Sequence, residues 1–215
     1  MSSSDAPVRP AGTRVRSGNA MLRTRAALLE AAAGCLQERG VRRTTMGDVA
    51  QAAGVAKATL YNHFRTKDDV LRALVDSRVE GLGAAACVDA AETGLPSALE
   101  RAAAGIAADG ALRTVATGEP ALLLALLAPG ESRGWAQART AVVSVLSAAG
   151  APTGPQAVDA VLRWLVGLLL WPATSDQARL GAALLAGLGD APAAQTVATA
   201  PVGAVEGASG VGWPG

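Results

Sequence analysis

The stretch TTMGDVAQAAGVAKATLYNHF, residues 44–64, decides the fold of this chain. Thr45 is followed three residues later by Asp48. This is the spacing of a capping box, in which the threonine side chain caps a helix and the acidic side chain bonds back to it. Gly54 suits the left-handed backbone conformation that a tight turn between helices needs. A capped helix, a glycine turn and a further short helix together predict a helix-turn-helix over residues 45–64.

The second helix of this unit is expected to have a buried and an exposed face. Val55, Leu60 and Phe64 are the apolar positions that can pack onto the preceding helices. The chain contains one tyrosine, one phenylalanine and one histidine, and all three lie here. This clustering indicates a role beyond core packing. The side chains left for solvent or DNA are Lys57, Ala58, Thr59, Tyr61, Asn62 and His63.

The residue types around the unit match the chemistry of nucleic-acid recognition. Phosphate oxygens accept hydrogen bonds from hydroxyl, imidazole and ammonium groups and from helix N-termini. A small residue such as Ala58 would let the second helix approach the major groove closely. There Lys57 could reach guanine acceptors, and Thr59 or Ala58 the methyl group of thymine. Donors for phosphate lie at the two ends of the unit: Thr45, Tyr61, His63 and Lys67.

The segments on either side are also predicted to be helices. Residues 22–39 carry apolar side chains at alternating spacings of four and three, which is one helical face, and Gly40 is suited to end that helix. After the unit, Thr66 and Asp69 have capping-box spacing and open a long helix to about Cys87. The apolar positions of the first of these helices are Leu22, Ala26, Leu29, Ala33 and Leu36.

Residues 44–67 and their flanking helices resemble the DNA-binding domain of the TetR/AcrR family of one-component repressors. Two residues depart from the family pattern. Ala56 stands where the family often has a serine as N-cap of the recognition helix, and Gly47 is a poor helix former inside the first helix of the unit. The features that match are Thr45, Ala52-Ala53-Gly54-Val55, Thr59-Leu60-Tyr61, His63-Phe64 and Lys67.

The resemblance implies an all-α homodimer that binds a palindromic operator and is released by a small effector bound in its C-terminal domain. It implies base reading by Lys57, Ala58 and Thr59, with Asn62 exposed beside them. It also implies phosphate contacts from Thr45, Tyr61, His63 and Lys67.

Composition supports the same fold class. Half of the 215 residues are hydrophobic but only 3% are aromatic, so the core must be built from Leu, Val and Ala. Alanine-rich sequence favours helices.

We expect an all-α protein with a three-helix DNA-binding domain at 21–66, then a helical effector-binding and dimerisation domain at 67–190. Residues 1–20 are expected to be a flexible basic arm, and residues 191–215 a disordered tail. Further helices are expected near 96–109, 119–128, 132–149, 155–171 and 176–188, with 110–118 either irregular or a short helix.

Charge and residue usage narrow the function classes. Residues 1–80 hold 13 Lys/Arg against 8 Asp/Glu, and residues 81–215 hold 6 against 10, which fits a basic DNA-binding head on an acidic body. The single histidine lies in the helix-turn-helix, so no catalytic Ser/His/Asp or Cys/His set is available, and an enzyme is not expected. Cys35 and Cys87 stand far apart without metal-ligand spacing. No cofactor, metal, secretion signal or membrane span is expected, and we expect a cytoplasmic protein.

The second domain carries weaker signals. The leucine-rich segment 120–129 is apolar on all sides and is expected to be buried. In the family the last two long helices form the dimer interface, and by their position in the chain these correspond to helices 155–171 and 176–188. An effector pocket here should be mainly apolar and should take a neutral ligand. The residues expected to line either this pocket or the dimer interface, with ordinary core packing as the alternative for the tryptophans, are Leu123, Leu127, Trp135, Trp164 and Trp171.

Two other functions remain open at this point. One is a helical protein-interaction module whose helix-turn-helix does not bind DNA. The other is a regulator of the same fold that activates transcription or acts without an effector. Saturable binding to a specific duplex would exclude the first.

Overall fold

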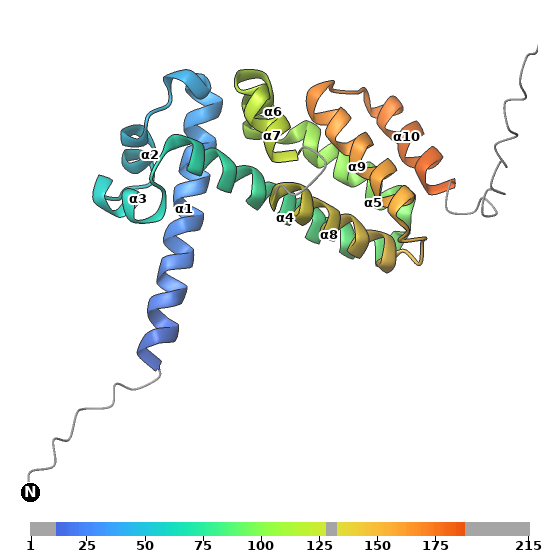
Figure 1. Ribbon diagram of the computed structural model, residues 1–215, viewed down its shortest axis with the longest axis horizontal. Helices are drawn as coiled ribbons and strands as arrows, with labels where there is room; N and C mark the ends of the chain where they lie inside the picture. Colours follow the sequence, from blue (N-terminus) through green and yellow to red (C-terminus); the bar gives the residue numbers. More distant parts are fainter. Residues whose placement is uncertain (1–11, 128–132, 188–215) are drawn as a thin grey trace, which may run out of the picture.

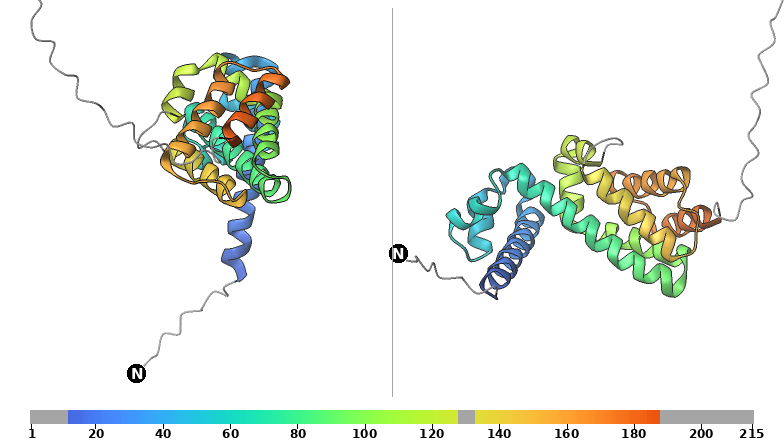
Figure 2. Two further views of the ribbon diagram at one scale, coloured as in Figure 1. Left: turned by 90° about the vertical axis from the view of Figure 1, so that its right-hand side faces the viewer. Right: turned by 60° about the horizontal axis from the view of Figure 1, so that its bottom comes forward.

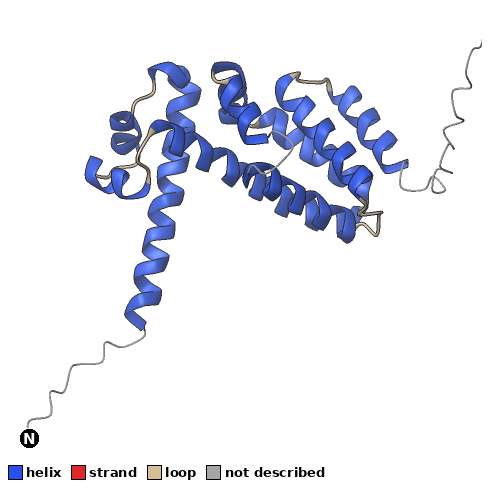
Figure 3. Ribbon diagram, in the orientation of Figure 1, coloured by secondary structure: helices blue, strands red, loops and turns tan. Residues whose placement is uncertain are grey.

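The computed structural model describes residues 12–127 and 133–187, and all regular structure within these ranges is α-helix (Figures 1 and 3). The all-α prediction is therefore confirmed. Residues 1–11 of the predicted arm and the predicted tail at 191–215 lie outside the described residues. The prediction of a flexible arm is wrong for residues 12–20, because α1 (Gly12–Arg43) already includes them. Extending an existing helix by one residue avoids the cost of nucleation, so a segment without an apolar pattern can still be helical.

The first half of α1 projects away from the rest of the protein (Figures 1 and 2). As a result Leu22 and Ala26 of the predicted apolar face are exposed, and burial begins at Leu28. Near its end α1 is interrupted at Gly40, which has a φ of 76°, a value that favours glycine. The helix-turn-helix follows as α2 (Met46–Ala52) and α3 (Lys57–His63).

Helix α4 (Lys67–Thr93) connects this head to the body of the molecule (Figure 2). It runs beyond the predicted end at Cys87. The segment left open at 110–118 is a helix, α6, capped by the side chain of Asp109. The body helices are α5 (Leu95–Ala108), α6 (Gly110–Gly118), α7 (Pro120–Leu127), α8 (Arg133–Ala148), α9 (Pro155–Leu170) and α10 (Ser175–Gly187).

Two clusters of buried side chains hold these helices together. The head-side cluster joins the head and the start of α4 to α6, α7 and the end of α9. The distal cluster joins the second half of α4 to α5, α8, α9 and α10. Glycine lets helices of the distal part approach closely. A Cβ on Gly83 would lie 2.7 Å from the Cβ of Ala141 on α8, and one on Gly181 would lie 2.5 Å from the indole Nε1 of Trp164.

Helix α7 is buried on one side only. Leu123, Leu126 and Leu127 are buried, as expected, but Leu124 is exposed. Within residues 12–127 and 133–187 no single helix has the length and hydropathy of a membrane span. Helices α6 and α7 meet that test together, but they are bent by 106° relative to each other.

Candidate nucleic-acid interface and apolar cavity

The capping box predicted at the start of α2 is present. Thr45 Oγ1 accepts a hydrogen bond from the Asp48 backbone N–H at 3.2 Å, and Asp48 Oδ2 accepts bonds from the Thr45 backbone N–H and hydroxyl at 2.9 and 2.7 Å. These bonds from Thr45 hold the pKa of the Asp48 carboxyl below its usual value. Arg39 forms a 2.7 Å ion pair with the other carboxylate oxygen of Asp48 and so ties α2 to α1.

The turn and the second helix are held mainly by packing. Gly54 has a φ of 66°, as the turn requires, and Val55 N–H then bonds to the Ala50 carbonyl at 3.0 Å. Ala56, the N-cap of α3, makes no side-chain cap, so this departure from the family pattern has a structural consequence. Helix α3 is instead anchored by Leu60 and Phe64, which are both buried.

The predicted DNA-binding residues of α3 divide by exposure. Lys57, Ala58, Tyr61 and Asn62 are exposed, whereas Thr59 and His63 are half-buried. The Lys57 side chain extends over Gly47 of α2, where a Cβ would lie 3.2 Å from Lys57 Cε. Glycine at position 47 therefore leaves room for this lysine, which gives the second departure a physical reason.

Lys67 is placed at the junction of α1 and α4. The capping box of Thr66 and Asp69 is present. The ammonium group of Lys67 donates a 3.0 Å hydrogen bond to the carbonyl of Val41, near the end of α1. A cation there is favourable because the C-terminal end of a helix carries a partial negative charge. The phosphate contact of Lys67 stays a prediction.

Three exposed arginines near the head were missed by the prediction from sequence: Arg42, Arg43 and Arg65. Arg42 and Arg43 lie three and two residues before the predicted phosphate contact Thr45. The signal that could have found them is the basic run before the capping box, since clustered arginines next to a helix N-terminus favour phosphate binding.

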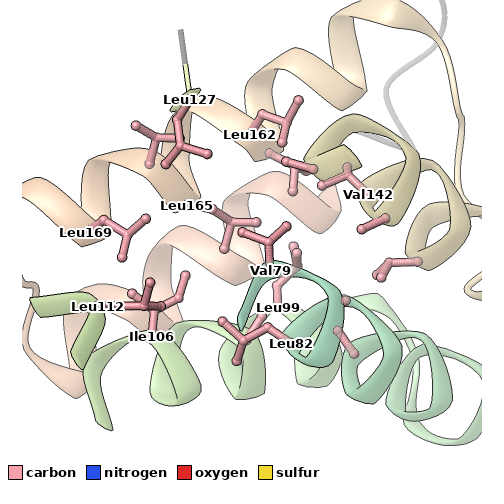
Figure 4. Close-up of a pocket in the computed structure, with 18 of the residues that line it drawn as sticks. Val79, Leu82, Leu99, Ile106, Leu112, Leu127, Val142, Leu162, Leu165 and Leu169 are labelled. Atoms are coloured by element: carbon pink, nitrogen blue, oxygen red, sulfur yellow. The ribbon is translucent and has the colours of Figure 1, made fainter. Parts of the chain in front are cut away.

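A cavity of about 90 Å³ lies within the body, lined by side chains from α4 to α9 (Figure 4). It sits where the head-side and distal clusters meet, because its walls include members of both. Every lining residue is Ala, Gly, Val, Leu or Ile, so the walls offer no side chain that could bond to a polar ligand. Representative residues are Val79, Leu99, Leu112, Leu127, Val142 and Leu165.

Of the five residues predicted for effector binding, Leu127 lines this cavity. The other four are placed elsewhere. Leu123 is buried in the head-side cluster and Trp135 in the distal cluster. Trp164 lies against Gly181, and the side chain of Trp171 is 75% exposed at the end of α9. Trp164 and Trp171 were expected to share a helical face because they are seven residues apart, but the walls are aliphatic residues that have the same spacing as ordinary core positions.

Comparisons with known proteins agree with this geometry. The family model for bacterial regulatory proteins of the tetR family matches residues 28–74, which contain the helix-turn-helix. The match is to this N-terminal segment, and it marks the helix-turn-helix as one of the tetR type. The segment that matches curated relatives is short and spans about a quarter of their length. The chain is 46% identical over 54 residues to the HTH-type transcriptional regulator TtgR of Pseudomonas putida (25% of this chain, 26% of TtgR). It is 45% identical over 56 residues to the HTH-type transcriptional repressor KstR2 of Mycobacterium tuberculosis (24% of this chain, 28% of KstR2).

Solved structures show that the likeness in fold covers most of the chain. The TetR-family repressor AlkX from Dietzia sp., implicated in biodegradation of n-alkanes, matches with a TM-score of 0.62 at 20% identity. The match covers 77% of this chain and 93% of AlkX. The multidrug binding protein EbrR complexed with ethidium matches with a TM-score of 0.51 at 23% identity, covering 75% of this chain and 97% of EbrR.

Proposed function

We propose that this protein is a dimeric transcriptional repressor of the TetR family that binds operator DNA and is released by a small apolar effector. The observation that carries the DNA-binding part is the arrangement of α3. Leu60 and Phe64 bury one face of the helix, while Lys57, Tyr61 and Asn62 are exposed on the other. A short helix that is anchored in this way and carries polar side chains outward suits the major groove.

The dimer part of the proposal rests on apolar side chains that the single chain leaves exposed. Trp171 at the end of α9 is 75% exposed, and Leu180 and Leu184 on α10 are 61% and 64% exposed. Leu180 and Leu184 are one helical turn apart and so share a face. Exposed apolar groups of this size on neighbouring helices mark an interface, and a second copy of the chain would cover them symmetrically.

The effector part rests on the cavity. Walls made only of hydrocarbon side chains disfavour a charged or strongly polar ligand, because such a group would lose its hydration without gaining a partner. An apolar cavity of about 150 Å³ is known to hold benzene, so a ligand of that size must spread the smaller cavity found here. Spreading the helices around the ligand is a means of changing the position of the head.

The two lysines of the head should have different effects on DNA binding. The operator is first selected from a pool of random duplexes, and affinities for operator and random DNA are then measured at several salt concentrations. Lys57→Ala should weaken operator binding by about 1–3 kcal/mol and relax the preference at one base pair. Lys67→Ala should weaken binding to both duplexes alike and lower the salt slope by roughly one unit per half-site.

Equal losses on both duplexes for Lys57→Ala would show that Lys57 contacts only the backbone. Absence of saturable operator binding by the unmodified chain would contradict the DNA-binding proposal itself. It would favour the alternative of a helical protein-interaction module. A reporter gene behind the operator then distinguishes repression from activation.

Toluene and benzoate test the effector proposal, since they share a ring and differ in a methyl group against a carboxylate. Toluene should raise the melting temperature, because a ligand that binds only the folded state stabilises it. It should also weaken operator binding, whereas benzoate at equal concentration should do neither. Release by benzoate alone would contradict an apolar effector site.

A further inference from the structure

The guanidinium group of Arg78 on α4 joins three helices. Its two terminal nitrogens donate to both carboxylate oxygens of Glu30 on α1, at 2.8 and 3.0 Å. Its Nε lies 3.1 Å from Asp109 Oδ2, an ion pair that is not aligned for a hydrogen bond. The other oxygen of Asp109 accepts the Leu112 N–H at 2.9 Å and thereby caps α6. We call Glu30, Arg78 and Asp109 the clasp.

The clasp and the cavity are built on the same turns of helix. Val75 and Val79, on either side of Arg78 in α4, line the cavity. Leu112, whose N–H is held by Asp109, lines it too. A ligand that displaces these wall residues must therefore move the backbone segments that carry Arg78 and Asp109.

Helix α6 also rests directly on α1. A Cβ on Gly110 would lie 2.6 Å from Gln37 Oε1, and one on Gly118 would lie 2.9 Å from Val41 Cγ2. Val41 is buried, and packed interiors do not deform gradually, so a shift of α6 at Gly118 is passed to α1 or breaks this contact. Glu30 and Val41 both belong to α1, the helix that carries α2 and α3 into position.

We propose that the clasp sets the angle between the helix-turn-helix head and the cavity wall, and that Arg78 is the residue through which an occupied cavity reorients the head. The second half of this statement rests on the proposed function. The contact of Arg78 Nε with Asp109 is not a hydrogen bond and is weaker than the two bonds to Glu30, so movement of α6 breaks it first. The clasp serves to position the head and contributes little to the free energy of folding. The side chain of Glu30 is 65% exposed, and an ion pair so open to water adds little to folding.

The first test needs neither DNA nor ligand. Spin labels are attached to cysteines introduced at the exposed positions Gln51 and Ser147, in a chain whose Cys35 and Cys87 are alanine. Labelled chains are diluted into unlabelled ones, and the distance distribution is measured by pulsed electron paramagnetic resonance. The parent should give one narrow distribution, and both Arg78→Gln and Glu30→Gln should broaden it. Arg139→Gln removes an ion pair of similar exposure between α8 and α9 and should leave it unchanged. A narrow, unshifted distribution for Arg78→Gln overturns the proposal.

The second test measures coupling. For the unmodified chain, we expect the operator affinity without toluene to exceed that with saturating toluene by about 5–150-fold, the range common for allosteric proteins. For Arg78→Gln this ratio should fall to within about twofold of one, with the toluene-induced rise in melting temperature retained. An unchanged ratio overturns the role of Arg78. A ratio of one in the unmodified chain contradicts the effector proposal instead, and the distance measurement still decides the clasp.

Discussion

Replacing Leu180 and Leu184 by glutamate should convert the proposed dimer into a monomer and lower operator affinity by about 100-fold or more, because linking two DNA-binding heads adds avidity of that order. Both leucines lie on α10 with more than half of their surface exposed. Across a two-fold interface each glutamate would meet the same apolar surface of the other copy. Burying a carboxylate there without a partner costs more than the contact gains.

Sedimentation at micromolar concentration measures the first effect, and titration of the selected operator the second. Leu124→Glu is the matched control. Leu124 is an exposed leucine, 49% accessible, that lies on α7 and so on neither α9 nor α10. The Leu124→Glu variant should stay dimeric and bind the operator with unchanged affinity. A double variant that still sediments as a dimer would show that the two copies meet elsewhere.

Replacing Leu60 by alanine should destabilise the head by about 2–5 kcal/mol, as expected for truncation of a fully buried leucine. Leu60 is 0% exposed and is the buried residue of a seven-residue helix. A helix so short is not stable alone, and α3 has no side-chain cap at Ala56. Operator affinity should therefore fall along with the melting temperature, although Leu60 itself touches no base.

Thermal melting and operator titration on the same preparation test this prediction. Leu22→Ala removes the same atoms from a leucine that is 66% exposed on α1, and it should change melting very little. Leu60→Ala with unchanged melting would mean that α3 is held by other contacts. The operator loss should be partly restored by Ala56→Ser, which supplies a cap of about 1 kcal/mol.

The parts of the structure that could be predicted from sequence are those encoded by near neighbours. The capping boxes at Thr45 and Thr66 and the turn at Gly54 depend on residues within a few positions of each other, and all three were predicted. The same local pattern predicted six exposed residues on α3, of which four are exposed and two, Thr59 and His63, are half-buried. Short α6 was left undecided, because nine residues with glycine at both ends give little periodicity.

The cavity could not be predicted in this way. Its walls come from six helices, and a cavity is the space that side chains distant in sequence leave unfilled. Val142 and Leu165 line it, yet nothing in their spacing separates them from core residues. Trp135 and Trp164, which were expected to line it, pack elsewhere. The contact of Lys67 with Val41 and the clasp were missed for the same reason, since both join residues far apart in the chain.

The close approach of Trp164 to Gly181 bears on how the gene for this protein can change. Any base change at the first two positions of a glycine codon introduces a side chain or a stop. At position 181 a side chain must push the rigid indole away, and α10 would move off α9 together with Leu180 and Leu184. At Gly167, on α9, a Cβ would have no neighbouring atom of the chain within 4 Å. For the fold of the single chain, a substitution at codon 181 is therefore more costly than one at codon 167, although the two codons mutate at equal rates.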